Sequence, residues 1–273
     1  MLPYTGRVSD LGSTVLAAFA VMFIGLSKAG FGGGLSMLTT PLCVLAFGSK
    51  DAIGILLPLL CAGDAFSLYH YWGKWEKKHL AYLLPGVVVG VLIGVQCIGQ
   101  FSPRQLNIVI GVMAVAFVVF QFTKERLFKA EGAFQPNAKL GWPFGLGIGV
   151  TSTFAHGAGP VAALYFVPQK LAKETFVGSN VLVFFWVNWI KMPFFVIDRG
   201  LVDLPVFAPH ALITRETILR SLFLLPVIPV GVWLGVWLNR RVSERWFSRL
   251  VYAFTFLAGL QLIFNFNVAK LFR

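Results

Sequence analysis

Two glycine-rich stretches decide how this chain folds: Lys28-Ala29-Gly30-Phe31-Gly32-Gly33-Gly34 and Phe154-Ala155-His156-Gly157-Ala158-Gly159-Pro160. Each lies within apolar sequence of membrane length, one in each half of the chain. Runs of glycine break helices because glycine loses the most backbone entropy and tolerates any φ. In a bilayer, broken backbone is tolerated only where protein buries it or where it lines a polar cavity. A matched pair of such breaks is a strong sequence indicator of a transporter's binding site.

The composition predicts an all-α, polytopic membrane helical bundle. Of the 273 residues, 57% are hydrophobic and 12% are charged, whereas soluble domains are about 25% charged. Apolar runs of membrane length recur along the whole chain. No polar stretch is long enough for a soluble domain, so residues 1–273 should form a single membrane domain.

The formal net charge is +12, from 23 basic and 11 acidic residues. The basic residues cluster in short loops, where they set orientation and meet lipid headgroups, so we expect membrane lipid and no nucleic acid as a partner. Cys43, Cys61 and Cys97 match no metal or disulfide spacing. We therefore expect no metal and no cofactor.

Ten apolar segments are predicted, near residues 8–28, 31–47, 51–71, 79–99, 104–123, 141–155, 157–171, 174–196, 216–238 and 246–266. The segments 141–155 and 157–171 each have about 15 residues, which at about 1.5 Å per residue is too short to cross a core of about 30 Å. We expect them to form a re-entrant hairpin. The chain would then have eight to ten membrane segments.

The two sets of five segments resemble each other. Asp64 aligns with Asn188, and Gly90 aligns with Gly231. The shared order predicts a first repeat over residues 8–123, a cytoplasmic linker over 124–140 and a second repeat over 141–266. Because each repeat has an odd number of segments, the two repeats would be inverted in the membrane.

Loop charges predict that both termini lie outside. With that orientation, the inner loops carry thirteen Lys and Arg residues and the outer loops carry eight. An excess of basic residues marks the cytoplasmic loops.

Ionisable residues within a membrane cost about 2.5–3.5 kcal/mol each on insertion scales, so each needs a reason. Lys28 precedes the first glycine break and is either a deep cation or a charge at a helix end. His156 opens the second break and could donate to an anion, exchange a proton or simply pack. Gly32, Gly33, Gly34, Gly157 and Gly159 could offer backbone N–H groups to an anion.

Asp64 and Asn188 occupy matching places in the two halves, and Lys191 lies one turn beyond Asn188 on the same helix face. Asp64 could pair with Lys191 or Lys28, carry a coupling proton as His156 could, or form a purely structural ion pair. Asn180 and Asn188 could complete a ligand shell. A cation pathway would need several buried carboxylates, whereas Asp64 is alone, so the residues favour an anionic ligand.

The chain resembles the TauE/SafE family of sulfite and organosulfur-anion transporters over essentially its whole length. The motifs that carry the resemblance are Gly30–Gly34 with Pro41, Ala52–Gly54, His156–Pro160, Phe176–Asn180, Gly231–Gly235 and Arg240–Ser243. The resemblance implies a multi-pass transporter of the bacterial inner membrane, built from two related halves. It also implies a substrate such as sulfite, sulfoacetate or a related organosulfonate.

We therefore expect a secondary transporter for a small sulfur-containing anion, coupled to an ion gradient. Its substrate-binding residues would be Lys28, Gly32–Gly34, His156, Gly157, Gly159, Asn180, Asn188 and Lys191, with Asp64 or His156 coupling a proton. A passive anion channel and a membrane-embedded enzyme are the alternatives. No nucleophile or metal cluster favours an enzyme, and no G-x-x-x-x-G-K-[ST] motif favours ATP hydrolysis. The residues leave the oligomeric state open, with a homodimer as one arrangement.

Overall fold

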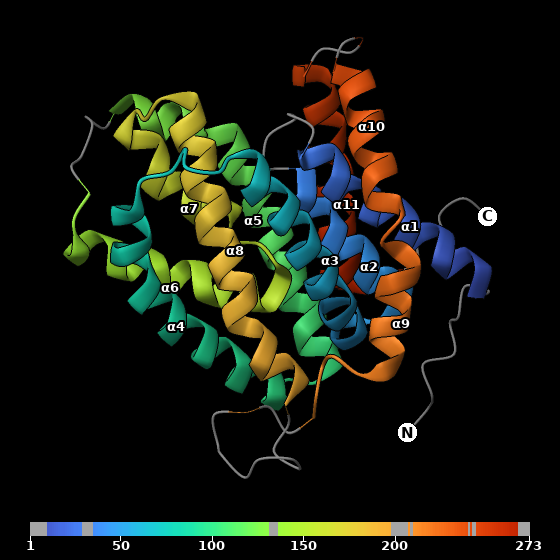
Figure 1. The fold of residues 1–273 in the computed structure, drawn as a ribbon. Helices are drawn as coiled ribbons and strands as arrows, with labels where there is room; N and C mark the ends of the chain where they lie inside the picture. The colour runs from blue at the N-terminus through green and yellow to red at the C-terminus, as the bar shows by residue number, and fades with distance from the viewer. Residues whose placement is uncertain are drawn as a thin grey trace.

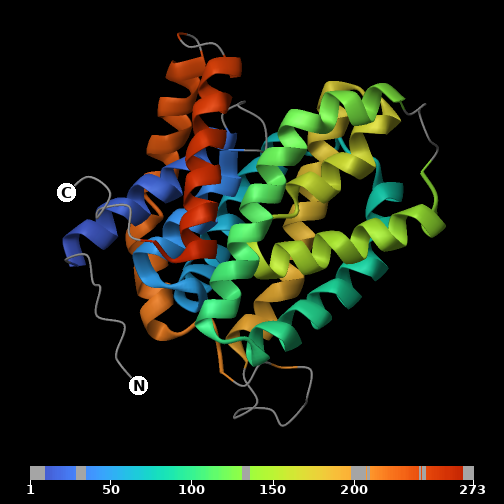
Figure 2. The same ribbon diagram turned by 180° about the vertical axis from the view of Figure 1, so that it is seen from behind.

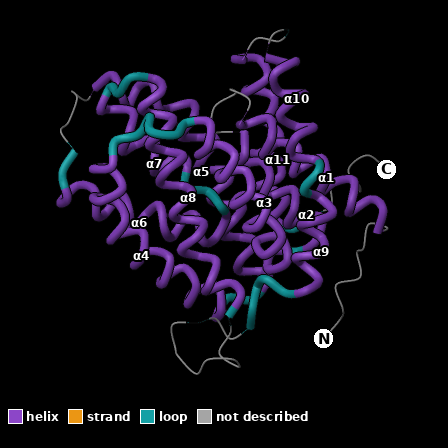
Figure 3. The backbone as a smooth tube through the Cα atoms, viewed as in Figure 1, coloured by secondary structure: helices purple, strands orange, loops and turns teal. Residues whose placement is uncertain are grey.

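The computed structural model describes residues 10–28, 35–130, 136–197, 207, 210–239, 241 and 244–266. Every regular element in these ranges is a helix (Figures 1 and 3), which confirms the predicted all-α class. The elements are α1 (Asp10–Lys28), η1 (Leu35–Leu38), α2 (Thr39–Phe47), α3 (Ser49–His70), α4 (Lys77–Gln100), α5 (Pro103–Ala130), α6 (Ala138–Ala155), α7 (Gly159–Phe166), η2 (Val167–Gln169), α8 (Lys173–Val196), α9 (Arg215–Leu224), α10 (Val227–Asn239) and α11 (Glu244–Phe264).

Each predicted apolar segment corresponds to a helix or to a pair of helices. Two boundaries differ from the prediction. Helix α5 continues to Ala130, into the stretch predicted as a linker, because residues 124–130 are good helix formers without glycine or proline. The segment predicted over 216–238 is divided into α9 and α10 by a turn at residues 225–226, where Pro226 removes a backbone donor.

Six helical stretches in the described ranges are long and apolar enough to cross a membrane: Ser49–His70, Lys77–Gln100, Pro103–Thr123, Lys173–Val196, Arg215–Leu238 and Trp246–Phe264. The stretch Leu11–Ser27 of α1 is shorter. Helices α2 and α7 have nine and eight residues, which gives lengths of only about 12–14 Å. The polytopic architecture is therefore confirmed, and the described ranges contain six stretches of this length, where eight to ten segments were predicted.

The two halves of the sequence interlock in space. Helix α4 of the first half packs along α6 of the second half, and α10 of the second half packs along α1 of the first half. Helix α5 lies beside α11, and α3 contacts α8. Figure 1 shows α4, α6, α7 and α8 on one side and α1, α2, α9 and α10 on the other, and Figure 2 shows α5 beside α11 from behind.

Glycines make the two long crossings close. A Cβ atom added to Gly149 of α6 would overlap the backbone of three α4 residues, Val87, Gly90 and Val91. A Cβ atom added to Gly25 of α1 would likewise overlap the backbone of three α10 residues, Ile228, Gly231 and Val232. Small residues that let helix backbones approach are the usual means of helix association in lipid.

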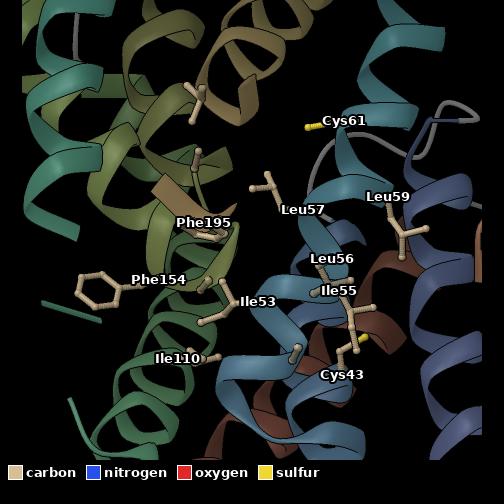
Figure 4. Close-up of a cluster of buried hydrophobic side chains, with 14 of the residues drawn as sticks. Cys43, Ile53, Ile55, Leu56, Leu57, Leu59, Cys61, Ile110, Phe154 and Phe195 are labelled. Atoms are coloured by element: carbon tan, nitrogen blue, oxygen red, sulfur yellow. The ribbon is translucent and has the colours of Figure 1, made fainter. Parts of the chain in front are cut away.

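The apolar core lies around α3, at the centre of the molecule. Ile53 and Leu57 point toward Phe154 and Phe195, whereas Leu59 lies on the opposite side of α3 (Figure 4). Many large apolar side chains of the outer helices are exposed, as expected where lipid replaces water. The core therefore surrounds the same part of α3 that carries the buried polar residues described below.

The substitution Gly149→Ala should destabilise the fold, because its methyl group has only backbone to displace at the α4–α6 crossing. We expect a loss of about 1–3 kcal/mol, the usual cost of overpacking, measured as a lowered Tm in detergent. Gly147→Ala is the matched control, since on the same helix its methyl would meet only the Val161 side chain. Equal Tm values for the two variants would show that the crossing is not closely packed.

Candidate functional site

The second glycine-rich stretch breaks the chain between two helices, as predicted. Helix α6 ends at Ala155, and α7 begins at Gly159. Between them, His156 adopts the left-handed conformation, with φ 50° and ψ 26°. This conformation costs an ordinary residue about 1–2 kcal/mol. The backbone N–H of His156 donates to Ser152 O at 3.0 Å, and the N–H of Gly157 donates to Thr151 O at 3.2 Å, so the end of α6 is capped.

A buried lysine reaches this break from α8. The Lys191 side chain is fully buried, with 0% exposure. Its Nζ donates to Ser152 O at 3.1 Å and to Ser152 Oγ at 2.9 Å, and it lies 3.2 Å from His156 Nδ1. An ammonium has three N–H donors, so these three acceptors satisfy it. Such satisfaction is needed because an unpaired buried charge is very costly.

The two contacts of the His156 ring fix its tautomer. Nε2 lies 3.1 Å from Ile53 O of α3, and a carbonyl can only accept, so Nε2 carries the hydrogen. Nδ1 faces the Lys191 ammonium, which can only donate, so Nδ1 is the acceptor. The ring is therefore neutral and joins α3, α6 and α8. In this conformation neither nitrogen is available to an anion or a proton unless Lys191 or Ile53 moves away.

Asp64 and Asn188, which align in the sequence, contact each other directly. Asn188 Nδ2 donates to Asp64 Oδ2 at 2.6 Å, and the two residues are 2% and 6% exposed. Lys191 is three residues beyond Asn188 on α8, and its ammonium contacts Ser152 and His156 as described. We call the five residues of this region the central polar cluster: Asp64, Ser152, His156, Asn188 and Lys191.

The other predicted binding residues lie apart from these contacts. Asn180 Nδ2 donates to Phe176 O within α8 at 2.9 Å. Gly157 is buried beneath Met37 and Met113, and in this conformation its amide donates to Thr151 O at the end of α6. Gly159 is the first residue of α7, where a helix N–H has no intrahelical acceptor.

The first glycine-rich stretch cannot be placed in the same way. Residues 29–34, with Gly32, Gly33 and Gly34, lie outside the described residues, as does the side chain of Lys28, the last residue of α1. The neighbouring helix α2 does reach the second break, because Thr40 Oγ1 donates to Ala155 O at 2.7 Å. The start of α2 and the end of α6 are therefore in contact.

Two contributors to the cluster were not predicted as binding residues. Ser152 supplies two of the three acceptors for Lys191, and it lies one turn before His156 on α6. The spacing of four residues within an apolar helix could have indicated it. The Ile53 carbonyl gives no side-chain signal and could not have been found from the sequence.

The cluster combines hydrogen-bond donors with few groups that suit redox or metal chemistry. Within the described ranges, no group of three or more His, Cys, Asp or Glu residues is placed to hold a metal ion. One buried ammonium, one amide and one hydroxyl can all donate to an oxyanion. An incoming anion would take the place of an acceptor that Lys191 now uses.

One family comparison matches the chain. The profile of the sulfite exporter TauE/SafE family matches residues 17–262, which is most of the chain. No curated protein and no solved structure matches it.

The Asp64–Asn188 contact should contribute to stability. The substitution Asn188→Leu removes a donor from a buried carboxylate, which should cost about 1–3 kcal/mol and lower the Tm. Asn180→Leu is the control on the same helix, because Asn180 is half-buried and bonds only to its own helix. We expect little change in the control. A comparable loss in both variants would indicate that the contact contributes nothing specific.

Proposed function

We propose that the central polar cluster binds the sulfur-containing anion that this protein transports. The premise is that the chain belongs to the sulfite exporter TauE/SafE family. The family is one of multi-pass membrane transporters rather than enzymes. Sulfite, sulfoacetate and related organosulfonates are the proposed substrates, and the bacterial inner membrane is the proposed location.

The observation that carries this proposal is the fully buried Lys191 ammonium beside a helix break. A cation in the membrane interior is retained for a function or a partner, and here its present acceptors are neutral groups. A negatively charged oxygen is a stronger acceptor than a serine hydroxyl or an imidazole. The anion would displace His156 Nδ1 or Ser152 Oγ and accept one or more hydrogen bonds from the Lys191 ammonium.

Other donors around the break support the same use. Thr39 Oγ1, beside Thr40 at the start of α2, is buried and has no hydrogen-bond partner among the described residues. Helix α7 begins with Gly159, whose N–H points out of the helix N-terminus, where anions are favoured. Gly32, Gly33, Gly34 and Lys28 remain proposed contributors from the first stretch.

We also propose that the chain is an inverted repeat. Gly25 and Gly149 are 124 residues apart, as are Asp64 and Asn188. The α10 residues that Gly25 contacts are each 141 residues later in the sequence than the corresponding α4 residues that Gly149 contacts. Equivalent helices thus meet through equivalent glycines. Direct contact between Asp64 and Asn188 is expected if the two equivalent positions lie on the pseudo-two-fold axis.

Proton coupling would use His156, Asp64 or both. When Lys191 moves away, His156 Nδ1 could take up a proton, and the protonated ring would no longer accept from Lys191, so the ammonium would have a donor free for an anion. Loss of the anion would favour release of the proton from His156. This linkage makes the proposal one of secondary transport, whereas a passive channel would show neither saturation nor a response to an imposed proton or sodium gradient.

Transport and binding can be measured with labelled sulfite and C2 sulfonates in proteoliposomes. Replacing the central cation in Lys191→Met should weaken binding about 10- to 100-fold, as expected for the loss of a charged hydrogen bond. Lys173→Met is the control, since Lys173 is an exposed cation at the start of the same helix. Unchanged affinity in Lys191→Met would remove the site assignment, and absence of protein-dependent flux under every imposed gradient would remove the proposed function.

Cys61 provides an independent test of where the anion binds. It lies on α3 one turn before Asp64 and is close enough to interact electrostatically with Asp64 and Lys191. In a Cys43→Ala/Cys97→Ala background, 2-sulfonatoethyl methanethiosulfonate should modify Cys61, because the reagent is itself a C2 sulfonate. Sulfite or sulfoacetate at saturating concentration should slow the modification, followed by mass spectrometry. The same rate with and without the anions would place the binding site elsewhere.

A further inference from the structure

A second buried histidine lies away from the central polar cluster, at the start of α4. The His79 side chain has 0% exposure. Its Nδ1 lies 3.3 Å from the Tyr165 hydroxyl of α7, and its Nε2 lies 3.2 Å from Glu76 Oε2. Its ring also meets Tyr165 and Phe166 edge to face. The histidine therefore joins the loop before α4 to the far end of α7.

Buried polar atoms of this site lack a well-directed hydrogen bond within the described residues. Nε2 of His79 is buried, and within the described residues it has no well-directed hydrogen bond, although it is at ion-pair distance from Glu76. Gln169 Oε1 is also buried without a hydrogen-bond partner in the described part of the chain. Gln169 Nε2 donates to the backbone O of Tyr165 at 2.7 Å. We call Glu76, His79, Tyr165 and Gln169 the His79 network.

The network can accommodate one added proton without losing a contact. In the neutral state, Nε2–H faces the Glu76 carboxylate, and Nδ1 accepts from the Tyr165 hydroxyl. After protonation, both ring nitrogens are donors. Nε2–H then forms an ion pair with Glu76, and Nδ1–H donates to the Tyr165 oxygen. The hydroxyl proton of Tyr165 must then turn away from the ring.

Charged and partly exposed side chains border the network at the start of α4. The Glu76 side chain is 37% exposed and forms an ion pair with Lys78 at 2.6 Å. The hydrogen bond from Lys78 lowers the pKa of Glu76 below its usual value, so the carboxylate stays charged beside His79. Nearby, Lys74 of the loop before α4 pairs with Glu174 of α8 at 3.1 Å.

Helix α7 connects the network to the proposed anion site. Tyr165 is near the end of α7, and the helix begins at Gly159, three residues after His156. Eight helical residues span about 12 Å. A change in the hydrogen bond between His79 and Tyr165 therefore acts on a short helix whose other end lies at the central polar cluster.

We propose that His79 is a proton-binding site at the start of α4 and that its protonation is coupled to anion transport through α7. The coupling to an anion rests on the proposed function. Proton binding by the His79 network is independent of that function. His79 is not in contact with the anion site. It would act as a positioning residue that sets how α7 is held against α4.

The test compares the pH dependence of sulfite and sulfoacetate flux in proteoliposomes between about pH 5.5 and about pH 8, the interval in which histidines usually titrate. The variant His79→Gln keeps a polar side chain but cannot gain the proton, and Tyr165→Phe removes the hydroxyl. His70→Gln is the matched control, because His70 is an exposed histidine at the end of α3. We expect a several-fold change of flux with pH in the wild type and in His70→Gln, and a nearly flat profile in His79→Gln.

A wild-type pH profile in a folded His79→Gln variant would overturn the proposal. Hydrogen exchange of residues 157–169 gives a second measurement that needs neither transport nor the His79 variant. After correction for the chemical pH dependence of exchange, the protection of these residues should change with pH in the wild type and not in Tyr165→Phe. Protection that does not respond to pH in the wild type would also overturn it. If protection depends on pH but no anion flux is found, the proposed function is wrong, whereas proton binding by the His79 network is supported.

Discussion

The structure depends on keeping one buried positive charge satisfied. Lys191 has no access to solvent, and an ion in such a place is stable only when fixed dipoles replace its hydration. Those dipoles come from Ser152 and His156, which in turn are held by the end of α6 and by the Ile53 carbonyl of α3. Helices α3, α6 and α8, with the break after α6, must therefore be positioned together before the lysine can be buried.

The left-handed conformation of His156 follows from this requirement. Glycine would adopt it without cost, and three small residues follow in the sequence. A histidine is instead placed there, and its ring fixes the break by bonding to two other helices. The break is thus rigid in this conformation, while the contact between the ring and Lys191 is one that an anion or a proton can replace. Local strain and a replaceable contact occur at the same residue, as is common at functional sites.

The sequence was sufficient to predict the positions of the helices, because apolar runs of membrane length are bounded by charged or glycine-rich loops. It also indicated Lys191, Asn188, Asp64 and His156, since polar residues within apolar helices are rare. It could not indicate which of them meet. Besides His156, the acceptors of Lys191 proved to be the hydroxyl and the backbone carbonyl of Ser152, and a backbone acceptor carries no sequence signal.

His79 was missed for a different reason. It lies only two residues inside α4, and a histidine near a loop reads as exposed. Its burial follows from periodicity, because Leu83 and Val87 follow it at helical spacing and face α6. The extension of α5 to Ala130 shows the converse, since charged residues there hid a helix that continues beyond the apolar segment.

The interlocking of the two halves bears on how the chain is made. Because α4 packs on α6 and α1 packs on α10, the first half leaves the ribosome with two helix faces whose partners have not yet been synthesised. Domains generally fold as units during synthesis, whereas the helices of the first half have their main packing partners in the second half. The glycine faces of α1 and α4 must wait in lipid, or against the insertion machinery, until the second half arrives. Assembly is therefore a late and concerted event, and the last helices to be inserted complete the packing of the first.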